Sequence, residues 1–487
     1  MSQPTIHTLG ALKASGYRSR SVKEELRENL IARLQSGRPS FEGIYGYDDT
    51  VIPDLERAIL ARHQVLLLGL RGQAKTRLAR LMLQLLDEWM PALEGCELME
   101  DPLLPLSREA KDILERDGDE ARIRWIHRND RLIEKLATPD VTVADLIGDA
   151  DPIKAANLRL PYSDERVIHF GLIPRAHRGL FVLNELPDLQ ARIQVALFNI
   201  LQEGDIQIRG FQLRFPLDIQ FVFTANPEDY TQRGSIVTPL KDRIESQILT
   251  HYPMDIQTAA KITLQEAQLH PQQKQCVSVP ALLSELLEQV AFEARHHEQV
   301  DGRSGVSARL SISAYECLVS TAERRMLRAG GTKTSARISD LSGTLQALTG
   351  KMELVFEGEK EGAINVARNL QRLAIRTVFA RYFPSPEKLK KKQDVSPYAA
   401  IIEWFNDHDL ILLSHDQDDT FRKHLQQVGG LWAVLKQYRP ETAQAEEAVW
   451  AEFILHALAD YSLISRKREG LQTTFGDLVG ALFGGRD

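Results

Sequence analysis

The chain has 487 residues, about three times the usual length of one domain, so several domains are expected. Hydrophobic residues make up 43% and charged residues 26% of the chain, a balance that excludes a disordered or fibrous protein. Lysine and arginine total 60 against 67 aspartates and glutamates, and the formal net charge of −7 lacks the basic excess of a dedicated nucleic-acid binder.

The beginning of the chain and its cysteines indicate a cytoplasmic location. The first twenty residues contain no apolar run of signal-peptide length, and no stretch of about 18 apolar residues occurs anywhere. Cys96, Cys276 and Cys317 are widely separated, which argues against a disulfide framework or a zinc ribbon. We therefore expect a cytoplasmic protein with reduced thiols and no membrane segment.

The first part of the chain alternates between helix and strand patterns. Residues 22–34 have the spacing of an amphipathic helix and end a polar lead-in. A helix pattern from residue 51 precedes an apolar run at 65–68, and a second helix is predicted over 76–88. Further strands are predicted at 180–183 and 219–224. This alternation predicts a doubly wound α/β fold with a parallel sheet.

The rest of the chain has mainly helical patterns. A polar stretch at 95–138 is too long for a simple connection and is interpreted as an insertion with some helix of its own. After Pro253 strand patterns nearly vanish. The predicted domains are a lead-in, an α/β nucleotide-binding domain with insertions, a helical lid and a C-terminal helical module. Their bounds are 1–40, 41–254, 255–350 and 351–487.

Residues 69–76 read GLRGQAKT, between the predicted strand and the predicted helix. That context gives a G-x-x-x-x-G-K-[ST] pattern its meaning, because loop N–H groups and a helix N-terminus can surround a polyphosphate. Lys75 supplies a charge for the β- and γ-phosphates, and the Thr76 hydroxyl supplies a ligand for Mg²⁺. The alternative is a helix start that carries Lys-Thr by chance. The predicted nucleotide contacts here are Gly69, Gly72, Gln73, Ala74, Lys75, Thr76 and Arg77.

Ala74 occupies the position where the pattern has its second glycine. A methyl group is tolerated there only if the residue keeps φ below zero. The sequence therefore predicts a slightly different loop closure that still binds nucleotide.

Residues 180–187 read LFVLNELP, an apolar strand that ends in Asn184 and Glu185. This strand resembles a Walker B strand, in which Glu185 would polarise the attacking water and the preceding residue would help to hold Mg²⁺. Asn184 replaces the usual aspartate, so metal affinity or turnover is expected to be reduced. Considered without the other motifs, the segment would be interpreted as a buried strand whose polar end residues form hydrogen bonds within the fold.

A third strand, at 219–225, leads to Asn226, and residues 239–244 read PLKDRI with Arg243 on a predicted helix. The order of these motifs is similar to AAA+ ATPases, closest to the magnesium-chelatase ATPase subunit and MoxR proteins of the helix-2-insert branch. Residues 171–180 and 191–204 resemble further sequence motifs of that branch. The resemblance covers roughly residues 41–327.

The resemblance implies further site residues. Asn226 would be the sensor that orients the hydrolytic water, and Arg243 the finger that reaches the γ-phosphate of a neighbouring subunit. Arg309 resembles a second sensor in the lid, with Arg303 as a less suitable substitute. Ile44 and Tyr45 stand where such proteins hold adenine. Without the order of motifs along the chain, each arginine would be interpreted as a solvated or ion-paired side chain.

Two hairpins and two basic groups complete the pattern. Alternating residues within 151–170 indicate a hairpin inserted into the second helix, and residues 205–214 indicate another around a glycine. Both are candidate moving parts. The basic groups at 388–392 and 466–468 are short and are interpreted as ordinary surface charge.

The resemblance implies an ATP-hydrolysing ring, expected to be a hexamer that uses ATP and Mg²⁺ to remodel or mature a protein partner. Such proteins work with a von Willebrand factor A domain protein, and nucleic acid is not expected as a partner. One alternative is the ATPase subunit of a magnesium chelatase, and another is a nucleotide-gated scaffold with weak or no hydrolysis. A sigma-54-type activator would need the string GAFTGA, which this sequence lacks.

Overall fold

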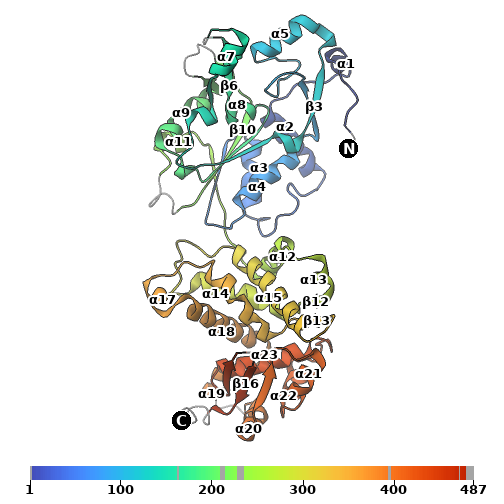
Figure 1. The fold of residues 1–487 in the computed structure, drawn as a ribbon, viewed down its shortest axis with the longest axis vertical. Coiled ribbons are helices and arrows are strands. Elements are labelled where there is room, and N and C mark those ends of the chain that lie inside the picture. Colours follow the sequence, from blue (N-terminus) through green and yellow to red (C-terminus); the bar gives the residue numbers. More distant parts are fainter. Residues whose placement is uncertain are drawn as a thin grey trace. The chain divides into compact units, whose positions relative to one another are not determined.

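The computed structural model describes residues 3–161, 164–208, 214–227, 235–392, 396–470 and 472–478. The chain forms two compact units, Met1–His251 and Tyr252–Asp487, each with hydrophobic clusters of its own. Over the described ranges, no helix combines the length and the apolar character needed to cross a bilayer. Figure 1 shows the fold.

The first unit combines short helices with a central sheet. Its α-helices are α1 (Leu9–Ala14), α2 (Val22–Gln35), α3 (Val51–Leu60), α4 (Lys75–Leu81), α5 (Arg108–Asp117), α6 (Val143–Leu146), α7 (Pro152–Leu158), α8 (Leu172–Arg175), α9 (Ala191–Glu203) and α11 (Thr238–Asp242). Its 3-10 helices are η1 (Met82–Leu85), η2 (Gly118–Glu120), η3 (Arg128–Arg131), η4 (Glu165–Val167) and η5 (Leu186–Asp188). Its strands are β1 (Val65–Leu68), β2 (Trp89–Leu93), β3 (Ile123–His127), β4 (Leu132–Leu136), β5 (Gly148–Ala150), β6 (Ile168–Phe170), β7 (Gly179–Asn184), β8 (Asp205–Gln207), β9 (Arg214–Pro216), β10 (Ile219–Ala225) and β11 (Ser246–Leu249).

The central sheet has five parallel strands in the order β11-β1-β10-β7-β4. Alternate residues of each inner strand enter different cores because successive side chains point to opposite faces. In β1, Val65 and Leu67 pack with α2, α3 and α4, whereas Leu66 and Leu68 pack in the core that α8, α9 and α11 share (Figure 1). The predicted α/β fold with helices on both faces is confirmed.

The insertion predicted at 95–138 contains more regular structure than its polar pattern indicated. It holds α5 and β3, and β3 pairs with β2 in an antiparallel ladder. It also holds β4, which joins the central sheet as an edge strand beside β7. The sequence did not reveal β4 because Glu134 and Lys135 interrupt its apolar pattern, as an edge strand permits.

The hairpin predicted within 151–170 is only partly confirmed, because β6 lies in that range but its partner strand β5 precedes it, whereas the hairpin predicted at 205–214 corresponds to the pair β8 and β9. β5 pairs with β6, α7 lies between them, and the short helices α6 and α8 flank the pair. β8 pairs with β9, and the tip of that hairpin, residues 209–213, lies outside the described residues.

The second unit is mostly helical. Its α-helices are α12 (Ile256–Glu266), α13 (Pro271–Cys276), α14 (Ala281–His296), α15 (Arg309–Arg328), α16 (Leu345–Thr349), α17 (Phe356–Glu361), α18 (Ala363–Tyr382), α19 (Pro386–Lys392), α20 (Ala399–Asp407), α21 (Asp418–Gln426), α22 (Leu431–Tyr438) and α23 (Glu447–Asp460). Its other elements are η6 (Ile338–Thr344), β12 (Val277–Ser278), β13 (Thr334–Ser335), β14 (Leu410–Leu413), β15 (Ser465–Glu469) and β16 (Gln472–Gly476).

The predicted C-terminal helical module also contains a small sheet. β14, β16 and β15 form an antiparallel sheet in that order. Its strand β15 reads SRKRE and faces solvent along most of its length, so no apolar pattern marks it in the sequence. The helices and this sheet share one large core that includes Phe379, Phe453 and Phe475.

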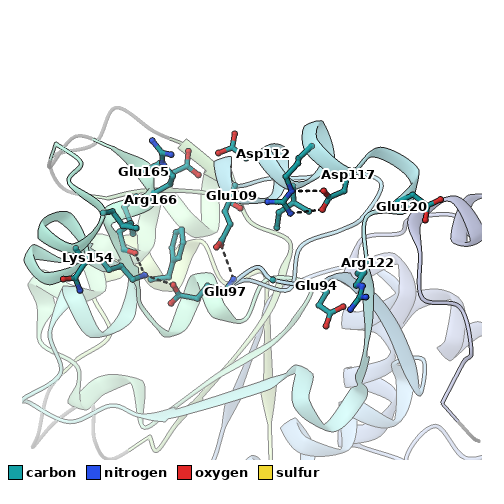
Figure 2. Close-up of a pocket in the computed structure, with 18 residues that line it drawn as sticks. Glu94, Glu97, Glu109, Asp112, Asp117, Glu120, Arg122, Lys154, Glu165 and Arg166 are labelled. Atoms are coloured by element: carbon teal, nitrogen blue, oxygen red, sulfur yellow. Dashed lines mark hydrogen bonds and ion pairs between the residues drawn. The ribbon is translucent and has the colours of Figure 1, made fainter.

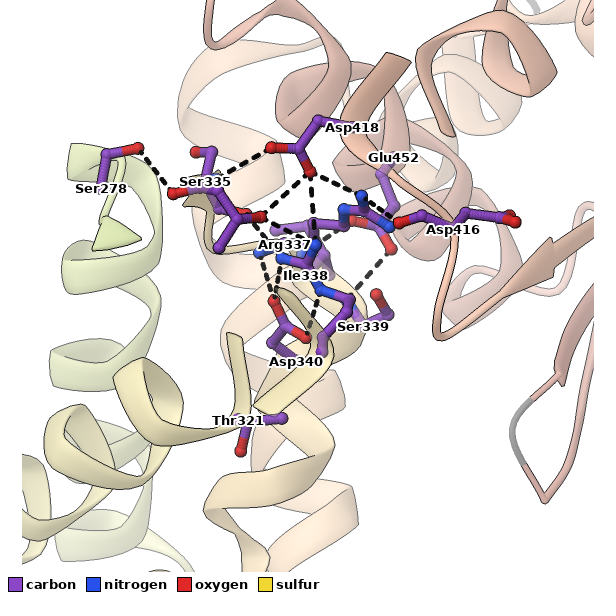
Figure 3. A network of polar contacts seen from close by, with 12 residues as sticks. Ser278, Thr321, Ser335, Arg337, Ile338, Ser339, Asp340, Asp416, Asp418 and Glu452 are labelled. Atoms are coloured by element: carbon purple, nitrogen blue, oxygen red, sulfur yellow. Dashed lines mark hydrogen bonds and ion pairs between the residues drawn. The ribbon is translucent and has the colours of Figure 1, made fainter. Parts of the chain in front are cut away.

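A buried polar network holds the middle of the second unit together (Figure 3). Glu452 of α23 accepts hydrogen bonds from the N–H groups of Ile338 (2.7 Å) and Ser339 (3.0 Å), which begin η6. Arg337 donates to Asp418 at 2.6 Å, at the start of α21. Because the first N–H groups of a helix have no partner within it, the Glu452 carboxylate serves as the cap of η6.

Candidate functional site

The predicted phosphate loop lies between the buried strand β1 and helix α4, where the pattern placed it. Gly72 has φ +72°, which a glycine adopts without strain. Ala74 has φ +54°, so the expectation that it keeps a negative φ is wrong. Ala74 is the residue before α4, and its carbonyl accepts from Leu78 N (2.9 Å). The turn into the helix requires the left-handed conformation despite the methyl group, at a cost of about 1 kcal/mol.

Gly69 is required by close packing at the start of the loop. A Cβ at this position would overlap the hydroxyl of Thr250 and the amide oxygen of Gln73. These two side chains hydrogen-bond each other at 2.9 Å, and both are buried. The contact holds the loop against the end of β11.

We expect Gly69→Ala to lower the affinity for ATP, the nucleotide that the sequence predicts, by about tenfold or more. The added methyl group must displace either the loop or the Thr250–Gln73 pair, and overpacking of this kind costs about 1–3 kcal/mol. Calorimetric titration with ATP measures the change. Gly302→Ala is the matched control, because a Cβ there meets nothing within 4 Å. Equal affinities for the two variants would contradict the prediction.

Lys75 is buried, and its ammonium group lies among three oxygen atoms. It donates to the carbonyls of Gly69 and Leu70, the latter at 3.1 Å, and to Asn226 Oδ1 at 2.8 Å. The predicted loop lysine and the predicted sensor asparagine thus meet, although 151 residues separate them. The parallel pairing of β1 with β10 brings them together, because both follow the carboxyl end of their strand.

Thr76 and Asn184, the two predicted Mg²⁺ ligands, are also adjacent. Thr76 Oγ1 donates to Asn184 Oδ1 at 3.0 Å, and Thr224 Oγ1 donates to the same atom at 3.2 Å. Hydroxyl and amide oxygens are hard ligands that suit Mg²⁺ when phosphate oxygens complete the shell. Within the described residues, no group of three or more histidine, cysteine or acidic side chains is placed to hold a metal. The donor set therefore fits an ion that is held largely by a bound phosphate.

Glu185 lies at the end of β7, beside Asn226. Asn226 Nδ2 donates to Glu185 Oε2 at 3.4 Å, and the Glu185 N–H donates to Thr224 Oγ1 at 3.1 Å. Glu185 has φ +56°, an unusual conformation for a non-glycine residue. Its carboxylate contacts the same Asn226 amide whose oxygen accepts from Lys75. Strained residues of this kind are typical of functional sites.

Arg243, the predicted finger, makes its contacts with residues outside this group. Arg243 is half-buried at the end of α11, where it donates to Gln202 Oε1 (2.8 Å) and to the Pro239 carbonyl (2.8 Å). Its guanidinium also lies 5.2 Å from the centre of the Phe198 ring. Arg309 is the exposed first residue of α15 and belongs to the second unit, as does Arg303.

The predicted adenine-binding segment reveals a residue that sequence reasoning missed. Ile44 is half-buried and Tyr45 is 44% exposed. Tyr47, which follows them, is buried, and its hydroxyl donates to the carbonyls of Gln73 (2.8 Å) and His251 (2.9 Å). Tyr47 thus ties the segment to the phosphate loop. Only its position two residues after Tyr45 could have signalled this role.

Arg77, another predicted contact, faces the same segment. Its Nε donates to the Gly43 carbonyl at 3.1 Å. It therefore joins α4 to the segment at 43–46, in which the sequence places the adenine site.

Residues 171–180, one of the two segments that carry the family resemblance, pack closely against neighbouring backbone. A Cβ at Gly171 would overlap the backbone after α6, and one at Gly179 would overlap the Arg131 carbonyl. Between them, burial and then the neighbouring Arg178 lower the pKa of His177 to about 4. His177 is therefore neutral at physiological pH, and its Nδ1 accepts from the Asp218 N–H at 3.2 Å.

A large open groove of about 1240 Å³ lies elsewhere in the first unit, between the insertion and the β5–β6 pair (Figure 2). Seven acidic and four basic side chains line it, and no phosphate-loop residue does. Some of the acidic side chains are paired, among them Glu97 with Lys154 (2.9 Å) and Arg175 (3.0 Å) and Asp117 with Arg116 (2.7 Å). An acid-rich wall repels a polyphosphate. The loop, not this groove, is therefore the candidate nucleotide site.

The comparisons with known proteins concern this site. The family model described as "Magnesium chelatase, subunit ChlI" matches residues 163–243. That range contains Asn184, Glu185, Asn226 and Arg243, and it ends before β11. The resemblance to AAA+ ATPases of the magnesium-chelatase type is confirmed.

Curated relatives of this chain include two magnesium-chelatase 38 kDa subunits. The subunit from Cereibacter sphaeroides is 25% identical over 201 residues, which cover 41% of this chain and 54% of the relative. The subunit from Rhodobacter capsulatus is 26% identical over 244 residues, which cover 48% and 64%. The chain thus matches less than two thirds of the length of either relative. A solved structure described as a complex between subunits BchI and BchD of magnesium chelatase is 18% identical, with a TM-score of 0.35 and coverage of 65% of this chain and 97% of that one.

Proposed function

We propose that the chain binds and hydrolyses ATP and acts as a ring motor on a protein partner. One observation supports this proposal above all: Lys75, Asn226 and Glu185 form a hydrogen-bonded series across three separate elements. A positive charge, an amide and a carboxylate in this order suit the hydrolysis of a phosphoanhydride.

Each residue has a distinct task in this proposal. Lys75 and the loop N–H groups bind the β- and γ-phosphates, and Thr76 and Asn184 would hold Mg²⁺, which supplies charge neutralisation when it is bound. Glu185 orients a water molecule and accepts its proton, and Asn226 fixes the direction of that carboxylate. The water oxygen forms a bond to the γ-phosphorus while the bond between that phosphorus and the bridging oxygen breaks, so that ADP and inorganic phosphate leave.

We further propose that the site is completed by a neighbouring copy of the chain. Arg243 is held by Gln202 and Pro239 within its own protomer and lies at the end of an exposed helix. An arginine that acts on the γ-phosphate of a neighbour requires a closed ring. By resemblance, that ring is a hexamer, and its partner is a von Willebrand factor A domain protein.

Specific observations favour two alternatives to the ring motor. The family model and the curated relatives favour the ATPase subunit of a magnesium chelatase, although the chain matches only part of those relatives. Asn184, whose amide lacks the charge of an aspartate, favours a nucleotide-gated scaffold that hydrolyses ATP weakly or not at all.

We expect Glu185→Gln to lower phosphate release by about 100-fold or more, because the amide cannot accept the proton of the attacking water. The affinity for ATP should stay within about threefold of wild type, since the loop contacts are intact. Phosphate release and ATP titration of the purified protein, at concentrations that favour oligomers, measure the two effects.

Glu115→Gln is the matched control for that experiment. Glu115 is an exposed carboxylate on α5, and its removal should leave both measurements unchanged. If wild type and Glu185→Gln bind ATP equally but neither releases phosphate, the motor proposal is wrong and the scaffold is favoured.

A further inference from the structure

The second unit contains a groove whose walls carry four arginines. It has a volume of about 550 Å³ and is lined by residues of η6, α18, α23, β15 and β16. Arg368 and Arg372 come from α18, and Arg466 and Arg468 come from β15. A smaller cavity beside it shares Arg468 and adds Arg324, Arg325 and Arg328 of α15, of which Arg325 is paired with Asp340 of the same cavity at 3.0 Å. The basic group 466–468, interpreted from sequence as ordinary surface charge, thus meets arginines from two distant helices.

Within the described residues, this positive charge is only partly compensated. Asp460 accepts from Arg466 at 2.8 Å and lies 3.8 Å from Arg372 Nε. Arg368 reaches only the amide oxygen of Asn365, at 3.5 Å. Arg468 makes no hydrogen bond or ion pair with any described residue. None of the residues that line the groove is an aspartate or glutamate.

The electrostatics of Arg468 support the same view. Burial lowers the pKa of Arg468, and repulsion from Arg368 and, more weakly, from Arg466 lowers it further, while attraction to Asp340 opposes this lowering. His456, which also lines the groove, is neutral, because burial lowers its pKa and its Nδ1 accepts from Arg466 at 2.8 Å. The groove therefore concentrates charge of one sign in a chain whose formal net charge is −7. A bound anion would relieve the repulsion.

We propose that this arginine groove binds a small ligand with two adjacent phosphate groups, a diphosphate. Guanidinium groups match phosphate oxygens in pairs, and the hydroxyls of Ser339 and Thr473 line the same groove as further donors. The volume lies within the range of small-molecule sites. Several arginines require more than one negative charge, which favours a diphosphate over a single carboxylate. The acidic net charge of the chain disfavours a nucleic acid.

The neighbouring network explains how the groove can keep its shape. Ser339 follows Ile338 at the start of η6, and both N–H groups are bound by the buried Glu452 (Figure 3). Ser342 Oγ donates to the Ser339 carbonyl at 2.8 Å. The floor is therefore fixed before any ligand arrives, which reduces the entropy lost on binding.

The test is a calorimetric titration of the full chain with inorganic pyrophosphate. Because pyrophosphate is also expected at the phosphate loop, the titration is made in a Lys75→Ala background, so that it does not depend on the proposed ATPase function. We expect this protein to retain one pyrophosphate site, weakened by about tenfold or more in Arg468→Gln and in Arg368→Gln. Lys467→Gln is the matched control, since Lys467 is 78% exposed, pairs with Glu469 and does not line the groove. That change should alter affinity by less than about twofold.

Other outcomes would overturn the proposal. They are the loss of all pyrophosphate binding in Lys75→Ala, or equal affinities for Arg468→Gln and Lys467→Gln. Stronger competition by citrate would favour a carboxylate ligand, and stronger competition by a single-stranded oligonucleotide would favour a nucleic acid. Thermal unfolding of each variant verifies that the second unit is folded. Arg368→Gln, on a different element, keeps the test decisive if Arg468→Gln fails to fold.

Discussion

Lys75→Ala is expected to lower both ATP affinity and phosphate release by about 100-fold or more. The Lys75 ammonium is buried among the carbonyls of Gly69 and Leu70 and the Asn226 amide oxygen, at the point where the loop surrounds the predicted phosphates. Alanine removes the charge that faces the phosphates, and preorganised charge of this kind contributes strongly to catalysis. It also releases Asn226, which contacts Glu185. Calorimetric titration with ATP and a phosphate-release assay measure the two losses.

Arg80→Ala is the matched control for Lys75→Ala. Arg80 is a basic residue on the same helix, α4, but it is exposed and pairs with Glu134 through contacts of 2.6 and 2.7 Å. Its removal should leave ATP binding within about twofold of wild type, because exposed ion pairs contribute little. If Lys75→Ala releases phosphate at the wild-type rate, hydrolysis does not use this loop.

The central part of the site could be predicted because its residues follow strands with strong apolar patterns. β1, β7 and β10 are buried along almost their whole length, so each is visible in the sequence as a short apolar run. Parallel strands bring their carboxyl ends to one edge of the sheet. Lys75, Glu185 and Asn226 each follow such an end. Their meeting is a consequence of the predicted topology.

Other features could not be predicted because they depend on tertiary contacts. The positive φ of Ala74 follows from the turn into α4, against its own side-chain preference. The contacts of Tyr47 with Gln73 and His251 join it to segments 26 and 204 residues further along the chain. No local pattern encodes such a contact. The edge strand β4 was hidden by charged residues, which an edge position allows.

The arginine groove is a further example of the same limit. Arg466 and Arg468 are two residues apart and lie on one side of β15, whereas Lys467 between them points away. Arg368 and Arg372 are four residues apart on α18 and therefore share one face of that helix. Each pair alone indicates a solvated face. Only the fold of the second unit places the two faces around one groove.

The second large effect is expected at a buried ion pair that attaches the N-terminal helix α2 to the sheet. Arg131 is 1% exposed and Glu25 is 6% exposed. The guanidinium binds both carboxylate oxygens, at 2.8 and 2.6 Å, and its Nε donates to the Arg178 carbonyl at 2.9 Å. Glu25 also accepts from the Asp87 N–H at 2.7 Å. The pair thus joins α2 to η3 and to the segment before β7.

Arg131→Ala should therefore lower the free energy of unfolding of the first unit by about 3–5 kcal/mol, because it leaves the Glu25 carboxylate buried without its counter-charge. Hydrogen exchange at the amides of α2 and β7 in increasing urea measures this loss separately from the second unit. In the double variant Arg131→Met with Glu25→Leu, part of the stability should return, since neither side chain then carries a buried charge.

Arg116→Ala separates the effect of burial from that of pairing geometry. Arg116 also binds both oxygens of a carboxylate, that of Asp117, at 2.7 and 2.8 Å, but its side chain is 70% exposed. Water solvates either partner when the other is removed, so no measurable change in stability is expected. If Arg131→Ala and Arg116→Ala are equally stable, burial adds nothing to the Glu25 pair and α2 is held to the sheet by its apolar face alone. Exchange protection at α2 that falls only in Arg131→Ala would instead show that the charge pair fixes this helix.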